Sequence, residues 1–173
     1  MCGHTVRFPR SAVNGPGWQV DLPTTEDTMR LGRAVAAVVR PGDLVVLAGP
    51  LGAGKTVLTQ GIGAGLAVQG RVTSPTFVIA RTHPGGRVPL VHVDAYRLGS
   101  VSEVDDLDLD SDLADAVTVV EWGSGLFEHL SDSFLTVRMH RHTDGETRTA
   151  VLVPTGESWV ERVRQLRSGW VLP

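Results

Sequence analysis

Apolar residues along this chain follow two patterns, helical spacing and short unbroken runs. In segment 24–43 they recur at helical spacing behind a group of hydroxyl and acidic residues, and a Pro-Gly pair follows them. This arrangement predicts an amphipathic helix. The run "DLVVLA" at 43–48 is typical of a strand buried on both faces of a parallel sheet, and "TVLTQGIGAGL" at 56–66 predicts a helix directly after it.

The rest of the chain predicts mostly strands. Two hairpins are expected, one joining strands 76–81 and 88–95 through a turn at 83–86, the other joining strands 133–142 and 147–153 around Asp144-Gly145. Between them we expect a buried strand in 115–122 and a short helix at 125–130, and a last helix near 157–167. Strands and helices in this order predict a three-layer α/β domain whose mixed sheet is parallel at the centre and antiparallel towards the edges.

Composition favours one globular domain. A chain of 173 residues with 42% hydrophobic content can bury a sufficient core without a metal or disulfide, and its single cysteine, Cys2, cannot form an internal disulfide. Residues 1–17 mix Pro, Gly and Arg without a period, so we expect a loose extension followed by a single domain over 18–173. The sequence shows neither a membrane-spanning run nor the apolar region of a signal peptide, and we expect a cytoplasmic protein.

The charge balance bears on the class of partner. The formal net charge is −3 and the pI is about 6.0. A large basic face for nucleic acid is therefore not expected, and any contact with RNA should be indirect.

The segment "GPLGAGKT" at 49–56 carries the strongest chemical signal. It fits the phosphate-binding pattern G-x-x-x-x-G-K-[ST], between a predicted buried strand and a predicted helix. Glycines there let backbone N–H groups surround phosphate oxygens at a helix N-terminus. Lys55 is the only lysine among sixteen basic residues; its compact ammonium can reach between phosphates better than a planar guanidinium can. The hydroxyl of Thr56 is suited to Mg²⁺, which predicts a P-loop NTPase-like nucleotide site.

Such a site needs a carboxylate for the metal or for the attacking water. Asp94 and Glu121 each end a predicted apolar strand and are the two candidates. The acidic segment 103–115 is expected to face solvent for the most part.

Four motifs together resemble a known family. "GPLGAGKT", "TSPTFVI", "HVDAYRL" and "VEW" occur in the order and spacing of the TsaE family, formerly called YjeE, over roughly residues 20 to 165. These are P-loop ATPases of bacterial tRNA threonylcarbamoyladenosine (t6A) biosynthesis. The resemblance implies ATP and Mg²⁺ as cofactors and protein partners of the TsaD and TsaB type. It further implies that the chain docks on the t6A synthesis complex and hydrolyses ATP to reset it.

The resemblance also implies roles for individual residues. Residues 74–77 would act as a switch-I-like loop near the γ-phosphate, with Thr76 as the contact. Thr56 and Glu121 would hold the metal, and Asp94 would align water or the γ-phosphate. The residues alone leave open which of the two carboxylates, Asp94 or Glu121, has which role. The expected catalytic residues are Asp94, Thr76 and Lys55. The expected nucleotide contacts are Thr25, Gly49, Gly52, Ala53, Gly54, Lys55, Thr56, Val57, Ser74, Asp94 and Trp122.

Two other classes of enzyme use the same loop. A GTPase switch would normally carry an N-K-x-D motif, which cannot exist here because Asn14 is the only asparagine and Lys55 the only lysine. A small-molecule kinase would need an acceptor pocket and an arginine-bearing lid, for which 81–87 ("RTHPGGR") is the one candidate, and this alternative stays open. No obvious arginine finger sits beside the motifs, so ATP hydrolysis by the protein alone should be slow. His92, on an apolar strand, is expected to be a hydrogen-bonded structural residue.

Overall fold

The computed structural model describes residues 17–107, 114–143 and 145–170. Residues 1–16 of the predicted N-terminal extension and part of the acidic segment 103–115 therefore lie outside the described residues. None of the described helices is long and apolar enough to cross a membrane.

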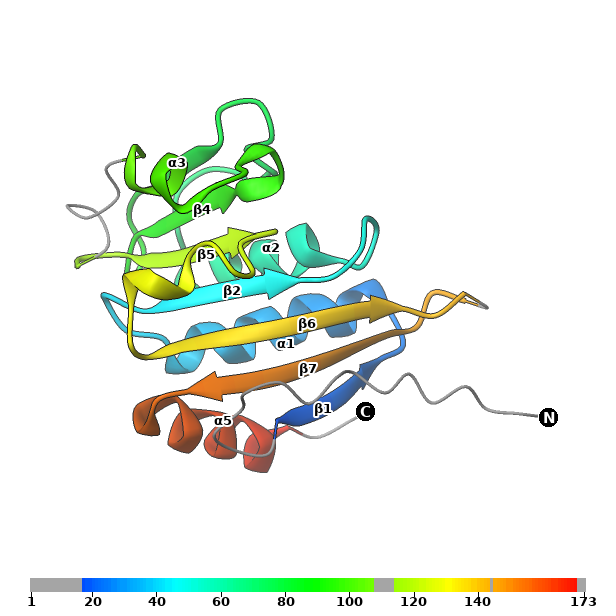
Figure 1. Ribbon diagram of the computed structural model, residues 1–173. Helices are drawn as coiled ribbons and strands as arrows, with labels where there is room; N and C mark the ends of the chain where they lie inside the picture. Colours follow the sequence, from blue (N-terminus) through cyan, green and yellow to red (C-terminus); the bar gives the residue numbers. More distant parts are fainter. Residues whose placement is uncertain (1–16, 108–113, 144, 171–173) are drawn as a thin grey trace.

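The described strands form one seven-stranded mixed sheet in the order β1-β7-β6-β2-β5-β4-β3 (Figure 1). Its strands are β1 (Trp18–Leu22), β2 (Leu44–Ala48), β3 (Ala80–His83), β4 (Leu90–Asp94), β5 (Val117–Glu121), β6 (Phe134–Arg141) and β7 (Arg148–Thr155). The central pairs β2–β5, β2–β6 and β4–β5 are parallel, whereas β1–β7, β6–β7 and β3–β4 are antiparallel. The predicted mixed sheet and both predicted hairpin pairings are confirmed.

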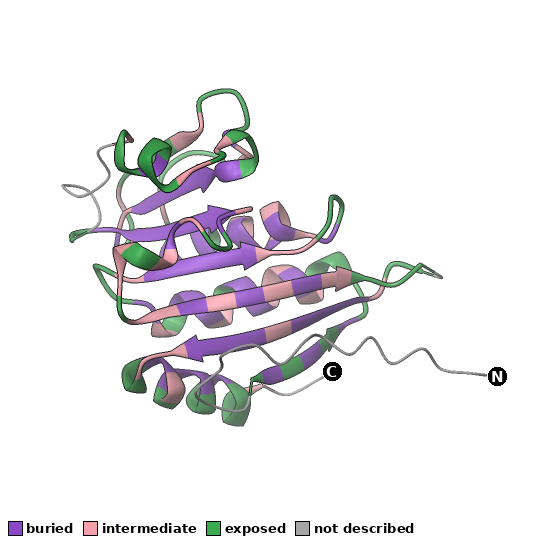
Figure 2. Ribbon diagram, viewed as in Figure 1, coloured by how far each residue is buried: buried purple, intermediate pink, exposed green. Residues whose placement is uncertain are grey.

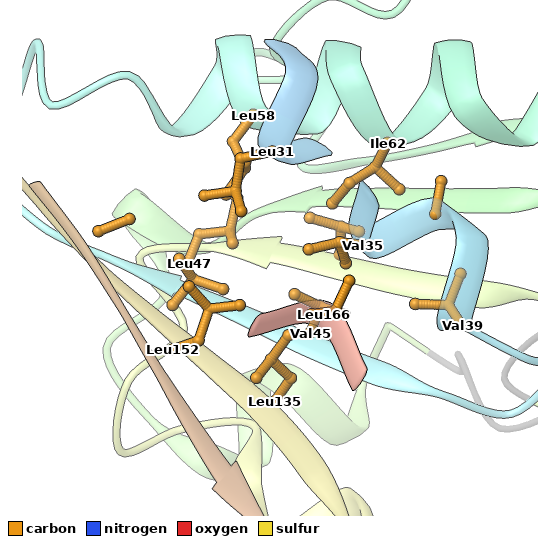
Figure 3. Packing of buried hydrophobic residues seen from close by; sticks show 14 of the residues in the cluster. Leu31, Val35, Val39, Val45, Leu47, Leu58, Ile62, Leu135, Leu152 and Leu166 are labelled. Carbon is orange, nitrogen blue, oxygen red and sulfur yellow. The ribbon is translucent and has the colours of Figure 1, made fainter. Parts of the chain in front are cut away.

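Helical segments lie on both faces of the sheet, as predicted. One face carries α1 (Thr25–Val38), α2 (Lys55–Leu66) and α5 (Glu157–Gly169), and their apolar side chains meet the sheet in one core (Figure 3). The short segments η1 (Ala95–Arg97), α3 (Val101–Asp105) and η2 (Glu128–Leu130) pack near a second core that includes Val46, Val93 and Val120. Strands β2, β4 and β5 are buried along nearly their whole length (Figure 2), which explains their unbroken apolar runs.

The packing of α1 against α2 fixes where α2 begins. A Cβ added to Gly32 would lie 2.4 Å from the Leu58 carbonyl oxygen, and one added to Gly61 would lie 2.4 Å from the Met29 carbonyl oxygen. The two helices thus touch through their backbones, which only glycine permits at these positions. This contact holds the N-terminus of α2, which starts at Lys55, in one place relative to the sheet.

Strand β1 was not among the predicted elements. Its five residues WQVDL alternate buried and exposed, and β1 pairs antiparallel with β7 at the edge of the sheet. Alternation over so few residues is a weak signal next to a segment rich in Pro and Gly. The pattern was present, however, because Trp18, Val20 and Leu22 all face the core.

The predicted strand over 76–81 is wrong in its first part. Residues 76–78 form a turn, and β3 begins only at Ala80. The side chains of Phe77 and Val78 are 93% and 58% exposed, so their apolar character does not reflect burial in a sheet. The N–H of Ile79 donates to the Pro75 carbonyl oxygen at 2.8 Å, and the φ of Ile79 is 67°, which closes the turn. The predicted helix at 125–130 is likewise reduced to the three-residue 3₁₀ helix η2.

Candidate nucleotide site

The predicted phosphate-binding loop connects the end of β2 to the first residue of α2. Its glycines Gly49, Gly52 and Gly54 have φ values of 145°, 78° and 101°, a region that other residues rarely adopt. A Cβ on Gly49 would lie 2.2 Å from the Met139 carbonyl oxygen, whereas one on Gly52 would meet nothing within 4 Å. The loop is therefore packed against β6 on one side and open on the other.

The open side of the loop borders a cavity of about 710 Å³. The carboxyl ends of β2, β4 and β5 meet there because these strands are parallel. Ten residues proposed from the sequence line this cavity: Gly52, Gly54, Lys55, Thr56, Val57, Ser74, Thr76, Asp94, Glu121 and Trp122. The structure thus brings four separate sequence motifs to one place.

Three residues proposed as nucleotide contacts do not line this cavity. Gly49 and Ala53 belong to the loop itself; Ala53 is fully buried, and its N–H donates to the Pro50 carbonyl oxygen at 3.2 Å. Thr25 is the first residue of α1, directly after the capping residue Thr24. Any contact from Thr25 would have to be made outside this cavity.

Lys55 is held by the loop that it follows. Its Nζ donates to the carbonyl oxygens of Gly49 and Pro50 at 2.8 and 3.0 Å and lies 3.6 Å from the centroid of the Trp122 ring. Burial lowers the pKa of Lys55, and the nearby charges of Glu121 and Asp94 partly oppose that shift. An incoming phosphate would therefore replace carbonyl contacts of an ammonium that is already oriented and largely desolvated.

Glu121 lies next to the threonine of the loop. Its Oε2 accepts a hydrogen bond from Thr56 Oγ1 at 3.1 Å. In the described part of the chain, no group of three or more His, Cys, Asp or Glu side chains is placed to hold a metal ion. One hydroxyl and one carboxylate nevertheless fit Mg²⁺, which keeps several waters and takes further oxygens from substrate phosphates. These two residues could hold Mg²⁺ together with a nucleotide.

Asp94 contacts a different part of the cavity wall. Its Oδ2 accepts hydrogen bonds from Ser74 Oγ at 3.0 Å and from Thr76 Oγ1 at 2.8 Å. Asp94 and Glu121 are direct neighbours in the β4–β5 register. The two carboxylates are thus adjacent but have separate partners: Asp94 is bonded to the segment 74–77, and Glu121 to the phosphate-binding loop.

Arg148 is the main residue of the cavity wall that sequence reasoning missed. It is the first residue of β7, is 8% exposed, and lines the cavity beside Gly54. Its Nη1 donates to the Glu146 carbonyl oxygen at 2.8 Å, while its Nε has no hydrogen-bond partner within the described ranges. The structure thus places beside the phosphate-binding loop an arginine that the sequence analysis did not single out. The sequence shows only an arginine near the start of the predicted strand 147–153, and this alone does not indicate a place at the cavity.

Two aromatic residues complete the wall. The rings of Tyr96 and Trp122 are in edge contact, with centroids 5.3 Å apart. Trp122 has a φ of 65° and lies between this ring and the Lys55 ammonium. Trp122 also packs against the second core, so one side chain contacts both that core and the Lys55 ammonium.

Comparison with known proteins gives one consistent result. The family model described as "Threonylcarbamoyl adenosine biosynthesis protein TsaE" matches residues 22–150. A relative from Streptomyces coelicolor is 56% identical over 135 residues, which cover 75% of this chain and 91% of the relative. One from Mycobacterium tuberculosis (strain H37Rv) is 50% identical over 150 residues, covering 82% and 89%. Both are called tRNA threonylcarbamoyladenosine biosynthesis protein TsaE.

A solved structure agrees with these relatives. The crystal structure of Bacillus subtilis YdiB superposes with a TM-score of 0.72 and 27% sequence identity, and the match covers 90% of this chain and 98% of that one. The mixed sheet and its helical layers therefore occur together in an experimentally determined protein.

Proposed function

The chain belongs to the TsaE family of threonylcarbamoyl adenosine biosynthesis proteins, and from this premise we propose that it binds ATP with Mg²⁺ in the cavity beside β2 and hydrolyses it slowly. One observation carries the proposal: a glycine-dependent loop, its lysine and threonine, and two strand-end carboxylates converge on the same cavity. Phosphate-binding loops of this form hold the β- and γ-phosphates of a nucleotide.

Each residue of the wall has a role in this proposal. The Lys55 ammonium leaves the loop carbonyls and binds phosphate oxygens, together with the N–H groups at the start of α2. Thr56 and Glu121 hold Mg²⁺, which neutralises charge on the phosphates when it is bound. Asp94 and Thr76 orient the attacking water or contact the γ-phosphate. Arg148 adds a positive charge close to Gly54.

We further propose that hydrolysis serves t6A synthesis through protein partners. The relatives are named for tRNA threonylcarbamoyladenosine biosynthesis, and the net charge of −3 argues against a direct tRNA-binding face. In this proposal the chain docks on cytoplasmic proteins of the TsaD and TsaB type. ATP hydrolysis then resets that complex between rounds of tRNA modification.

The structure bears on segment 81–87, which the sequence analysis considered as the lid of a small-molecule kinase. In segment 81–87, a Cβ on Gly86 would lie 2.1 Å from the Leu66 carbonyl oxygen, and the Arg87 N–H donates to that same oxygen at 2.8 Å. Leu66 is the last residue of α2, whereas Lys55 at its start borders the cavity. Residues 86–87 are fixed at the far end of α2, which argues against this segment closing over the cavity as a lid.

Following the γ-phosphate of ATP separates hydrolysis from phosphate transfer to a metabolite. With ATP labelled in that phosphate, we expect slow release of inorganic phosphate by the chain alone and faster release when the t6A synthesis proteins are added. Lys55→Ala should release none above background. Label appearing in a small molecule from a metabolite pool, with no inorganic phosphate released, would replace the hydrolase proposal with the kinase one.

A further inference from the structure

His92 belongs to β4 and makes one side-chain contact with the candidate metal residue. Its Nε2 lies 2.9 Å from Glu121 Oε1, and the two side chains are buried, with 0% and 4% of their surface exposed. A carboxylate oxygen only accepts hydrogen bonds, so Nε2 is the nitrogen that carries the proton. His92 therefore donates to Glu121 in a site shielded from water.

This contact follows from the register of two parallel strands. His92 is paired with Val119, so Glu121, two residues further along β5, is its diagonal neighbour on the same face of the sheet. That face is the one covered by α2, whose second residue is Thr56. The Glu121 carboxylate is thus contacted by the imidazole from β4 and by the Thr56 hydroxyl from the start of α2.

The two oxygens of Glu121 are consequently divided between two donors. Oε1 accepts from His92, and Oε2 accepts from Thr56. With Oε1 fixed, the carboxylate plane cannot rotate freely, and Oε2 stays directed at the threonine. His92 does not line the cavity, and its Nδ1 has no hydrogen-bond partner among the described residues. Among the described residues, the hydrogen bond to Glu121 is the one that links the His92 side chain to the residues lining the cavity.

We propose that His92 is a positioning residue that orients the Glu121 carboxylate, and thereby sets how strongly Mg²⁺ binds with the nucleotide. The inference rests on the proposed function, because it needs Thr56 and Glu121 to hold Mg²⁺. Partners that orient a metal ligand in this way are typically worth 10- to 100-fold in metal affinity.

The test compares His92→Leu, which removes the donor, with His92→Gln, whose amide can still donate towards Glu121. ADP affinity is measured by calorimetry across a range of Mg²⁺ concentrations, and thermal unfolding reports folding. For His92→Leu we expect metal-free ADP affinity within about twofold of wild type and a Mg²⁺ midpoint raised about 10- to 100-fold. His92→Gln should restore most of that loss. Thr118→Val is the control: Thr118 is a buried residue of the neighbouring strand β5 whose Oγ1 has no hydrogen-bond partner in the described part, and this change should leave the midpoint unchanged.

Other outcomes overturn the inference. An unchanged Mg²⁺ midpoint in folded His92→Leu contradicts it. An equal loss of ADP affinity with and without Mg²⁺, in both the Leu and the Gln variant, also contradicts it, because such a loss would show that His92 has a purely structural role. If His92→Leu does not fold, His92→Asn, whose amide is too short to reach Glu121, takes its place with the same expectations. If wild-type protein binds no ADP at any Mg²⁺ concentration, the proposed function fails and this inference fails with it; wild-type binding with an unaltered variant overturns the inference alone.

Discussion

Replacing Lys55 by alanine will weaken ATP binding by about 100-fold or more while leaving the fold intact, the scale of losing one partner of a desolvated charge pair. Within the described residues, the Lys55 ammonium contacts two loop carbonyls and the face of Trp122 and belongs to neither apolar core, so we expect its removal to leave the fold intact. Calorimetric titration with Mg·ATP measures the loss, and thermal unfolding of the variant verifies that the domain is intact.

Lys55→Arg is the sharper variant at this position. The guanidinium keeps the charge but is planar and wider than an ammonium, so it should not fit between the carbonyls of Gly49 and Pro50 or between two phosphates. We expect a loss close to that of alanine. Wild-type affinity and turnover in Lys55→Arg would show that geometry does not explain the single lysine of this chain.

Asp94→Asn will lower ATP turnover by about 10²-fold or more with Mg·ADP affinity close to wild type, the scale of losing one positioned catalytic group. Asparagine keeps one oxygen that can accept from Ser74 or Thr76, so the wall of the cavity should persist. It loses the charge that would orient water or contact the γ-phosphate. Steady-state phosphate release and ADP calorimetry on the same preparation separate the two effects.

Glu121→Gln is the matched control for that variant. It is equally conservative and changes the neighbouring residue in the β4–β5 register, but here the lost charge faces Thr56. Nucleotide affinity should become nearly independent of Mg²⁺, and affinity and turnover should fall together. The same metal dependence in both variants would contradict the division of roles between the two carboxylates.

Local signals in the sequence were sufficient for the centre of the fold and the loop. Strands β2, β4 and β5 are buried on both faces, and such strands leave unbroken apolar runs. The phosphate-binding loop is equally local, because its glycine conformations and its lysine belong to eight consecutive residues. Where local apolar content and burial disagree, as for the exposed Phe77 and Val78, the prediction of a strand failed.

The parts of the site that the sequence did not predict depend on contacts between distant segments. Arg148 reaches Gly54 because β7 pairs with β6, which is parallel to β2, and His92 reaches Glu121 through a diagonal neighbour relation between β4 and β5. Neither contact can be predicted from the residue spacing within one motif, because the register of a sheet depends on how whole strands pair. A sequence pattern can therefore indicate which residues lie at the site, but it does not indicate which residues orient the side chains of others.

Multiple-turnover synthesis of t6A on tRNA, with purified TsaD- and TsaB-type proteins of the same organism, tests the central claim most directly. Product per complex is measured with the wild-type chain, with Lys55→Ala and with the chain omitted. We predict many turnovers with the wild-type chain and ATP, and no more than about one turnover in the other two reactions. Sustained synthesis with Lys55→Ala, or without the chain, would contradict the claim that this protein resets the complex by hydrolysing ATP.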